Sequence, residues 1–243
     1  MVKPGTLLVV GVAVAVPLVV VLSTRKKTAP PTLDPESPED DDPGESDGMP
    51  HSPTHTIAKP LVVGPPSSAL VAPYIALLIK EFQEHGADTS LVVPMITMTK
   101  APKQQGQRPV AVPPQNMWAG LATVAGIVTI VKSQSLQGVS TRTTGYRPQD
   151  YNAAVGGAAK SRHIFGDAAD VWLNDPNEEN REKLRMGFAR YIVSHSKSSG
   201  LGFGFGVYTN DIHIDVGRKA GQIVTWKQGK KFIDKAKAEL GIA

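Results

Sequence analysis

A proline-rich acidic segment divides the chain and restricts folding to the residues after it. Residues 28–66 hold ten prolines and few large apolar residues, and residues 34–47 within them carry eight acidic groups and no basic one. Such a segment cannot bury enough apolar surface to offset the entropy lost on ordering, so we expect an extended, disordered linker. A folded domain is therefore expected only over residues 67–243.

The segment before this linker predicts a membrane anchor. Residues 6–22 are apolar and uncharged, and about 17 residues is the short end of what spans a bilayer. A cleaved signal peptide is the alternative, but residues 23–27 make a poor cleavage site. We expect residues 1–27 to form a retained single-span anchor. The basic residues 25–27 favour a cytoplasmic location for the domain after the anchor, but the orientation stays open.

Composition and charge narrow the chemistry. Cysteine is absent, which excludes disulfides, cysteine metal sites and a thiol nucleophile. From residue 60 onward the chain has 21 lysines and arginines against 14 acidic residues, a net charge of +7. A basic body suits an anionic polymer, an anionic lipid surface or nucleic acid. No helix-turn-helix, zinc finger or RNA-binding aromatic pair is recognisable, so nucleic acid is not an expected partner.

Hydrophobic periodicity predicts an α+β fold, because helices and strands alternate without βαβ regularity. The expected helices cover residues 67–86, 117–132, 177–194 and 229–240, with Leu240 facing inward. The expected strands cover residues 139–143, 168–173, 207–216 and 222–226, and residues 98–116 are expected to form a loop or a second linker. Residues 117–132 could form either a buried core helix or a second membrane span. The short length of the segment favours the buried core helix.

Two separate segments carry candidate metal ligands. His163 and Asp170 lie seven residues apart, separated by Gly166 and followed by a predicted strand. In the strand over residues 211–216, side-chain alternation places Asp211, His213 and Asp215 on one face. Imidazole and carboxylate groups are the ligands of catalytic zinc sites that keep a position open for water. From spacing alone, a structural histidine and an ion-paired aspartate remain alternatives.

The order of the motifs resembles a known family. The residues that carry the resemblance are Gly145-Tyr146-Arg147, Tyr151-Asn152, Gly156-Gly157, Ser161-x-His163-x-x-Gly166-x-Ala168-x-Asp170, Gly204-x-Gly206-x-Tyr208 and His213-x-Asp215-Val216-Gly217. Over about residues 117–226 the chain resembles the zinc D-Ala-D-Ala carboxypeptidases and peptidoglycan endopeptidases of peptidase family M15.

The resemblance implies a site and an activity. It implies one Zn2+ per chain, held by His163, Asp170 and His213, and it implies that Arg147 neutralises the developing oxyanion or grips a substrate carbonyl or carboxylate. The implied fold is a small antiparallel sheet with flanking helices. The implied activity is hydrolysis of peptide bonds involving D-amino acids in peptidoglycan, as a DD-carboxypeptidase or an endopeptidase, in wall remodelling or lysis. The partners would be a peptidoglycan peptide and, through the anchor, a membrane, with the catalytic domain on the extracytoplasmic side.

One position departs from the family pattern. Many relatives place a general-base carboxylate three residues before the last zinc histidine, and here that position is Asn210. We expect Asp211 to serve as the base instead, since it shares the His213 face. Asp215 is the alternative base, or it orients a ligand. If neither carboxylate reaches the water, the domain would bind peptidoglycan without cleaving it.

Overall fold

The computed structural model describes residues 59–135 and 141–242, and all of them fall in one unit. The predicted anchor over residues 1–27 lies outside the described residues, as does most of the predicted linker. No helix in the part of the chain that the structure describes is long and apolar enough to cross a membrane. In chain order the elements are β1 (Val62–Gly64), α1 (Ala72–Glu84), η2 (Thr89–Leu91), α2 (Val92–Ile96), β2 (Val110–Val112), η3 (Gln115–Met117), α3 (Trp118–Ser135), β3 (Thr141–Thr144), α4 (Gln149–Ala154), η4 (Arg162–Phe165), β4 (Ala168–Leu173), α5 (Glu178–His195), β5 (Gly202–Val207), β6 (Asp211–Arg218), β7 (Ile223–Lys227) and α6 (Gly229–Leu240).

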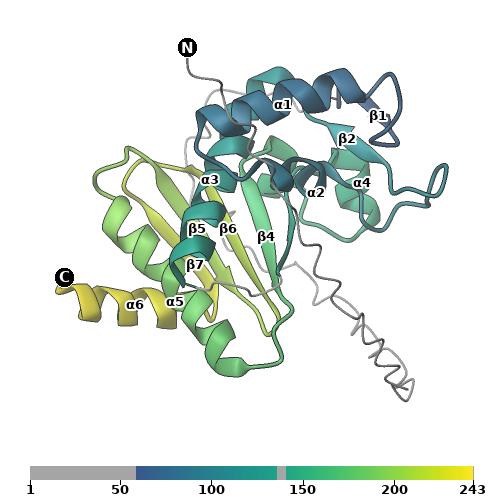
Figure 1. The fold of residues 1–243 in the computed structure, drawn as a ribbon. Helices are drawn as coiled ribbons and strands as arrows, with labels where there is room; N and C mark the ends of the chain where they lie inside the picture. The colour runs from purple at the N-terminus through teal and green to yellow at the C-terminus, as the bar shows by residue number, and fades with distance from the viewer. Residues whose placement is uncertain (1–58, 136–140, 243) are drawn as a thin grey trace, which may run out of the picture. The chain divides into compact units, whose positions relative to one another are not determined.

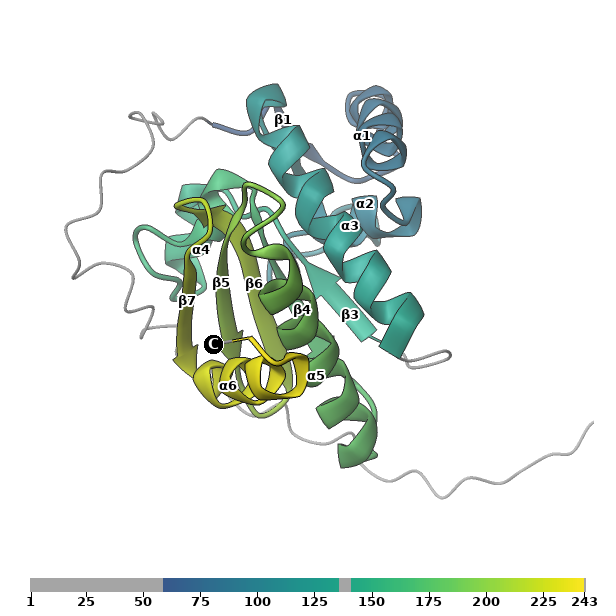
Figure 2. The same cartoon turned by 90° about the vertical axis from the view of Figure 1, so that its left-hand side faces the viewer.

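A five-stranded sheet in the order β3-β4-β6-β5-β7 organises the domain (Figure 1), and the order is visible in Figure 2. Its pairs are antiparallel except for β5 and β7, which run parallel. The predicted α+β class is confirmed, and the expected antiparallel sheet is corrected at this one edge. The connection from β6 crosses the start of β5 to reach β7, and a Cβ on Gly202 would lie 2.0 Å from the carbonyl oxygen of Lys219. Only glycine allows the backbones to approach so closely.

Helices α3, α5 and α6 pack on one face of this sheet (Figures 1 and 2). The side chains that meet there are fully buried, and they include Leu121, Val124, Val128, Leu184, Phe188, Ile192, Phe203, Phe205, Ile212 and Ile214. Helix α3 is therefore a core helix, as its length predicted. The other face of the sheet is left to the polar residues of β4 and β6.

Local signals set most helix ends. Asn177 caps α5 by accepting a hydrogen bond from the Glu179 amide (2.9 Å), and Gly241 ends α6 in the left-handed conformation. Helix α1 starts later than the predicted residue 67, because Pro73 occupies its first turn. Leu240, expected to face inward, is 43% exposed in the last turn of α6.

The strands differ more from expectation. The predicted strand over residues 207–216 corresponds to β6, which begins only at Asp211, and β5 before it was missed. The amide of Tyr208 donates to the carbonyl of Asp211 (2.9 Å) across the turn between the two strands. Two further strands were missed: β1 lies inside the expected linker and β2 inside the expected loop. They pair with each other, Val62 opposite Val112, and all of β2 is buried. Their β-branched residues hold a short ladder despite the surrounding prolines.

Candidate metal centre

Strand register places two of the predicted ligands side by side. Asp170 of β4 lies directly opposite His213 of β6 in the antiparallel ladder. Directly opposed residues share a face of the sheet. Ile212 and Ile214, the residues on either side of His213 in β6, are fully buried on the opposite face, against the helices. The alternation predicted for this strand is thus confirmed, and it directs His213 away from the core.

The third ligand comes from the turn that leads into β4. His163 lies in η4, and Gly166 ends this turn with a φ of 70°. The turn is held in place because the amide of Arg147 donates to the carbonyl of His163 (3.1 Å). As a result His163, only 1% exposed, points back toward the strand β4.

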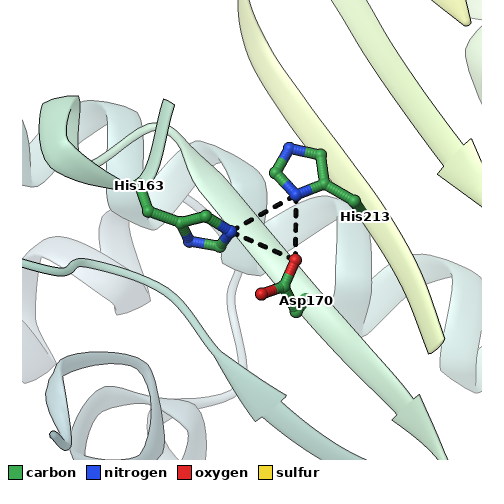
Figure 3. A group of neighbouring side chains, drawn as sticks. All are labelled: His163, Asp170 and His213. Atoms are coloured by element: carbon green, nitrogen blue, oxygen red, sulfur yellow. Dashed lines mark hydrogen bonds and ion pairs between the residues drawn. The ribbon is translucent and has the colours of Figure 1, made fainter. Parts of the chain in front are cut away.

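The three side chains converge on one point (Figure 3). One ligand atom from each of His163, Asp170 and His213 can be chosen so that all lie within 4.8 Å of one another. His163 Nε2 is 3.1 Å from Asp170 Oδ1 and 3.3 Å from His213 Nδ1, and His213 Nδ1 is 2.8 Å from Asp170 Oδ1. The spacing of two nitrogens and one oxygen suits a shared cation.

Each of these side chains also has a partner behind it. His163 Nδ1 donates to the carbonyl of Gly145 (2.7 Å), which leaves Nε2 as the acceptor atom facing the group. Arg147 Nη2 binds Asp170 Oδ2, so Oδ1 is the oxygen that faces the histidines. His213 Nε2 lies 3.6 Å from Asp215 Oδ2. Outer partners of this kind fix the orientation of metal ligands and, for histidine, its tautomer.

The electrostatics favour positive charge at this point. Burial by itself would raise the pKa of Asp170, but its interactions with His163 and Arg147 hold it well below its usual range. Burial would lower the pKa of His213, but its contacts with the carboxylates of Asp170 and Asp215 raise it to about 10. A carboxylate that stays ionised and an imidazole in a negative field form a donor set that fits a divalent cation.

Asp215 is a buried partner of His213 and of an arginine. It is 0% exposed, and Arg218 donates to it twice, from Nε to Oδ1 (3.0 Å) and from Nη2 to Oδ2 (2.9 Å). The Arg218 and His213 contacts hold the pKa of Asp215 at about 2, although burial opposes them. This arrangement matches the orienting role that was one of the two predicted for Asp215.

The glycines of β5 make room for these groups. A Cβ on Gly204 would lie 2.0 Å from Asp215 Oδ2, and one on Gly206 would lie 2.3 Å from Trp226 Nε1. Trp226 fills that space beside His213, with ring centroids 5.2 Å apart, and its Nε1 donates to Tyr208 Oη (2.8 Å). The G-x-G-x-Y motif therefore supports the wall behind His213.

The two predicted catalytic residues have different surroundings. Arg147 contacts Asp170, a partner that sequence did not reveal. Asp211 begins β6 and pairs with Trp172, two residues along the strand from the Asp170 and His213 pair. It shares their face but is not one of the three converging ligands, and its role as base stays a prediction. Asn210, at the family's base position, is exposed in the turn before β6.

Sequence reasoning missed a second, partly buried ion pair near the site. Arg162 binds Asp167 through both oxygens, closing the turn that carries His163. A Cβ on Gly217 would overlap the Arg162 guanidinium, at 1.5 Å from Nη2. The sequence could have predicted this pair, because Arg162 and Asp167 carry opposite charges and lie five residues apart with Gly166 between them. Trp226 and Arg218 gave no such signal, because they reach the site through strand pairing and the turn of β6.

Comparison with known proteins agrees with this geometry. Residues 110–215 match the family model described as Peptidase M15. The matched segment contains the three converging ligands and Arg147, and it ends at Asp215. No curated protein and no solved structure matches the chain.

Proposed function

We propose that this chain is a zinc metallopeptidase that cleaves peptide bonds involving D-amino acids in peptidoglycan, because residues 110–215 match the family model described as Peptidase M15. The family supports peptidase-like chemistry, and the proposal extends it to the metal and the substrate. The observation that carries the proposal is the convergence of His163, Asp170 and His213. DD-carboxypeptidase and endopeptidase action both fit this site.

The residues present fit a zinc ion. Two imidazole nitrogens and one carboxylate oxygen are the ligands of catalytic zinc sites, and each one here has an orienting partner. When bound, zinc supplies Lewis-acid activation of a water molecule and of the scissile carbonyl.

The protein's own groups carry the remaining steps. Asp211 shares the face of His213, and its carboxylate would accept the proton of the attacking water and pass it to the leaving amine. Asp215 does not suit this task, because it is fully buried and bound twice by Arg218. Arg147 keeps a permanent positive charge beside Asp170, where it would stabilise negative charge developing on the carbonyl oxygen.

The decisive test combines metal analysis with muropeptide chromatography. We expect about one zinc per wild-type chain and release of muropeptides from purified peptidoglycan. His163→Ala should lose both, because it removes a ligand, while circular dichroism shows an intact fold. His85→Ala is the matched control, since His85 is exposed just after the last turn of α1 and distant in sequence from the ligands. Unchanged digestion by His163→Ala would contradict the proposal.

The role of Asp211 needs its own variant. Asp211→Asn should lower kcat by roughly 10²- to 10⁴-fold, the usual contribution of a general base, with zinc content unchanged. An unaltered kcat would remove Asp211 from the mechanism.

The presence of Asn210 at the family's base position favours one other function, a peptidoglycan-binding module that does not cleave. Zinc bound without muropeptide release in the wild type would support that module.

We also propose that residues 1–27 anchor the chain in a membrane, with the peptidase domain on the extracytoplasmic side. The uncharged run over residues 6–22 and the location of peptidoglycan support this. Since the chain has no cysteine, Ser198→Cys would add a single exposed thiol. Labelling of intact cells by a membrane-impermeant maleimide is the expected result, and protection until lysis would contradict the orientation.

A further inference from the structure

We propose that Arg142 and Trp172 form a substrate subsite that binds a carboxylate-bearing residue of the peptide. We call this pair the Arg142–Trp172 shelf. The inference rests on the proposed function, because it places the shelf beside the reacting bond. It adds the chemical class of one substrate residue and that residue's distance from the bond that is cut.

Sheet register places the shelf next to the metal ligands. Arg142 of β3 lies opposite Trp172 of β4, just as Thr144 lies opposite Asp170. Directly opposed residues, and residues two apart on one strand, share a face of the sheet. The shelf therefore lies on the face of Asp170, two residues along the strands, which is about 7 Å.

The shelf has the chemistry of an anion site. The Arg142 guanidinium carbon lies 4.7 Å from the centroid of the Trp172 ring. Arg142 is exposed and Trp172 is half-buried, so the charge is accessible while the ring supports it. Stacking on an aromatic ring orders the guanidinium in advance, and its planar fork matches a carboxylate.

Arg142 differs from the other arginines near the ligands. Arg147, Arg162 and Arg218 each bind a carboxylate of the protein itself. Within residues 59–135 and 141–242, no carboxylate pairs with Arg142, and its described contact is the Trp172 ring. No carboxylate of these described residues takes up its charge, so a substrate carboxylate can pair with it.

The spacing fixes where the substrate carboxylate must be. An extended peptide advances by about 3.3–3.6 Å per residue, so about 7 Å corresponds to two residues. A peptide whose scissile bond lies at the His163, Asp170 and His213 group would reach the shelf with the residue two positions away. That residue is expected to be acidic.

Matched peptides test this directly. Peptides that differ only by glutamate or glutamine, two residues before or two residues after the scissile bond, would be cleaved by the zinc-loaded full chain. For the peptide whose glutamate lies at the position that reaches the shelf, Arg142→Gln should raise KM roughly 10- to 100-fold. This is the usual contribution of a charge-assisted hydrogen bond. The kcat and the cleavage of the glutamine peptide should change less than about twofold.

The control and rescue variants separate binding from folding. Arg190→Gln is the matched control, because Arg190 is an arginine on α5, whose side chain is 50% exposed and pairs with Glu239, and it should alter neither peptide. Trp172→Phe should keep most of the glutamate preference, whereas Trp172→Leu should lose it because the stack is gone. Equal losses for both peptides, or none in Arg142→Gln, would overturn the shelf.

Failure of the proposed function gives a different result. If the wild type cleaves none of the peptides, calorimetric titration still compares their binding. Tighter binding of a glutamate peptide than of its glutamine partner, abolished in Arg142→Gln, would support the shelf without any cleavage. Equal binding of the two peptides by the wild type would overturn it.

Discussion

Asp215→Asn separates the orienting role of Asp215 from simple packing. The substitution keeps the shape of the side chain but removes the charge that Arg218 binds through two hydrogen bonds (3.0 and 2.9 Å). It also removes the charge that faces His213 Nε2 at 3.6 Å. Because Asp215 is 0% exposed, water cannot replace the lost interactions without opening the sheet.

The structure sets the size of the effect. Removing one partner of a buried ion pair costs about 3–5 kcal/mol of unfolding free energy. The Arg218 side chain keeps 13% exposure, so the lower end applies, and we expect a loss of ~3 kcal/mol. His213 also loses its outer partner, for which a 10- to 100-fold loss in zinc affinity is the usual order of magnitude.

Two measurements check both parts. Urea unfolding of the metal-free protein gives the stability change, and chelator competition gives the zinc affinity. Asp234→Asn is the matched control, since Asp234 pairs with Lys230 (2.6 Å) but its side chain is 56% exposed. Exposed pairs contribute at most about 1 kcal/mol, and this pair is distant in sequence from the ligands.

Three outcomes would refute the reasoning. If Asp215→Asn loses no more stability than Asp234→Asn, burial does not strengthen the pair. Groups in contact usually show a coupling energy of roughly 0.5–3 kcal/mol. If the stability loss of the double variant Asp215→Asn/Arg218→Gln equals the sum of the losses of the two single variants, the two side chains are not coupled. Unchanged zinc affinity would remove Asp215 from the support of His213.

Three further predictions concern the sheet and its core. Gly206→Ala should cost about 1–3 kcal/mol and alter the near-UV circular dichroism, because its Cβ would lie 2.3 Å from Trp226 Nε1; an unchanged spectrum would contradict the close contact. Phe188→Ala should lower the unfolding free energy by roughly 3–5 kcal/mol, since Phe188 is fully buried between α5 and the sheet; urea unfolding measures this, and a loss below about 1 kcal/mol would be inconsistent with a packed core. Burial, aided by Asp150, raises the pKa of Tyr146 to about 12, so its stability contribution should be present below pH ~10 and lost as the pH rises toward ~12; Tyr146→Phe should remove that loss in unfolding curves measured across this range.

The elements with a strong helical period were predictable from sequence. In α5 the apolar residues Leu184, Phe188 and Ile192 repeat every four positions, and all are fully buried. In α6 the terminating Gly241 marks the helix end. The converging ligands were predictable too, because strand alternation and motif order both pointed to them. Here the local pattern and the tertiary structure agree.

Strand pairing accounts for what the sequence did not reveal. Strand β5 was missed because Gly202, Gly204 and Gly206 weaken the strand propensity of this segment, although these glycines share one face of the strand. The positions of Trp226 and Arg142 depend on which strands are neighbours, and the sheet order β3-β4-β6-β5-β7 is not a local property. The Arg147 contact with Asp170 likewise links segments 23 residues apart.

The direct opposition of Asp170 and His213 ties assembly of the metal ligands to correct alignment of β4 and β6. If the two strands paired one residue out of step, either Asp170 would turn toward the helices and be replaced by Ala169 or Val171, or His213 would turn and be replaced by Ile212 or Ile214. Under the proposed function, a misaligned chain would not hold the ion, whereas a correctly aligned one would gain its binding energy. Metal added during refolding should consequently select the native alignment over its nearest competitor.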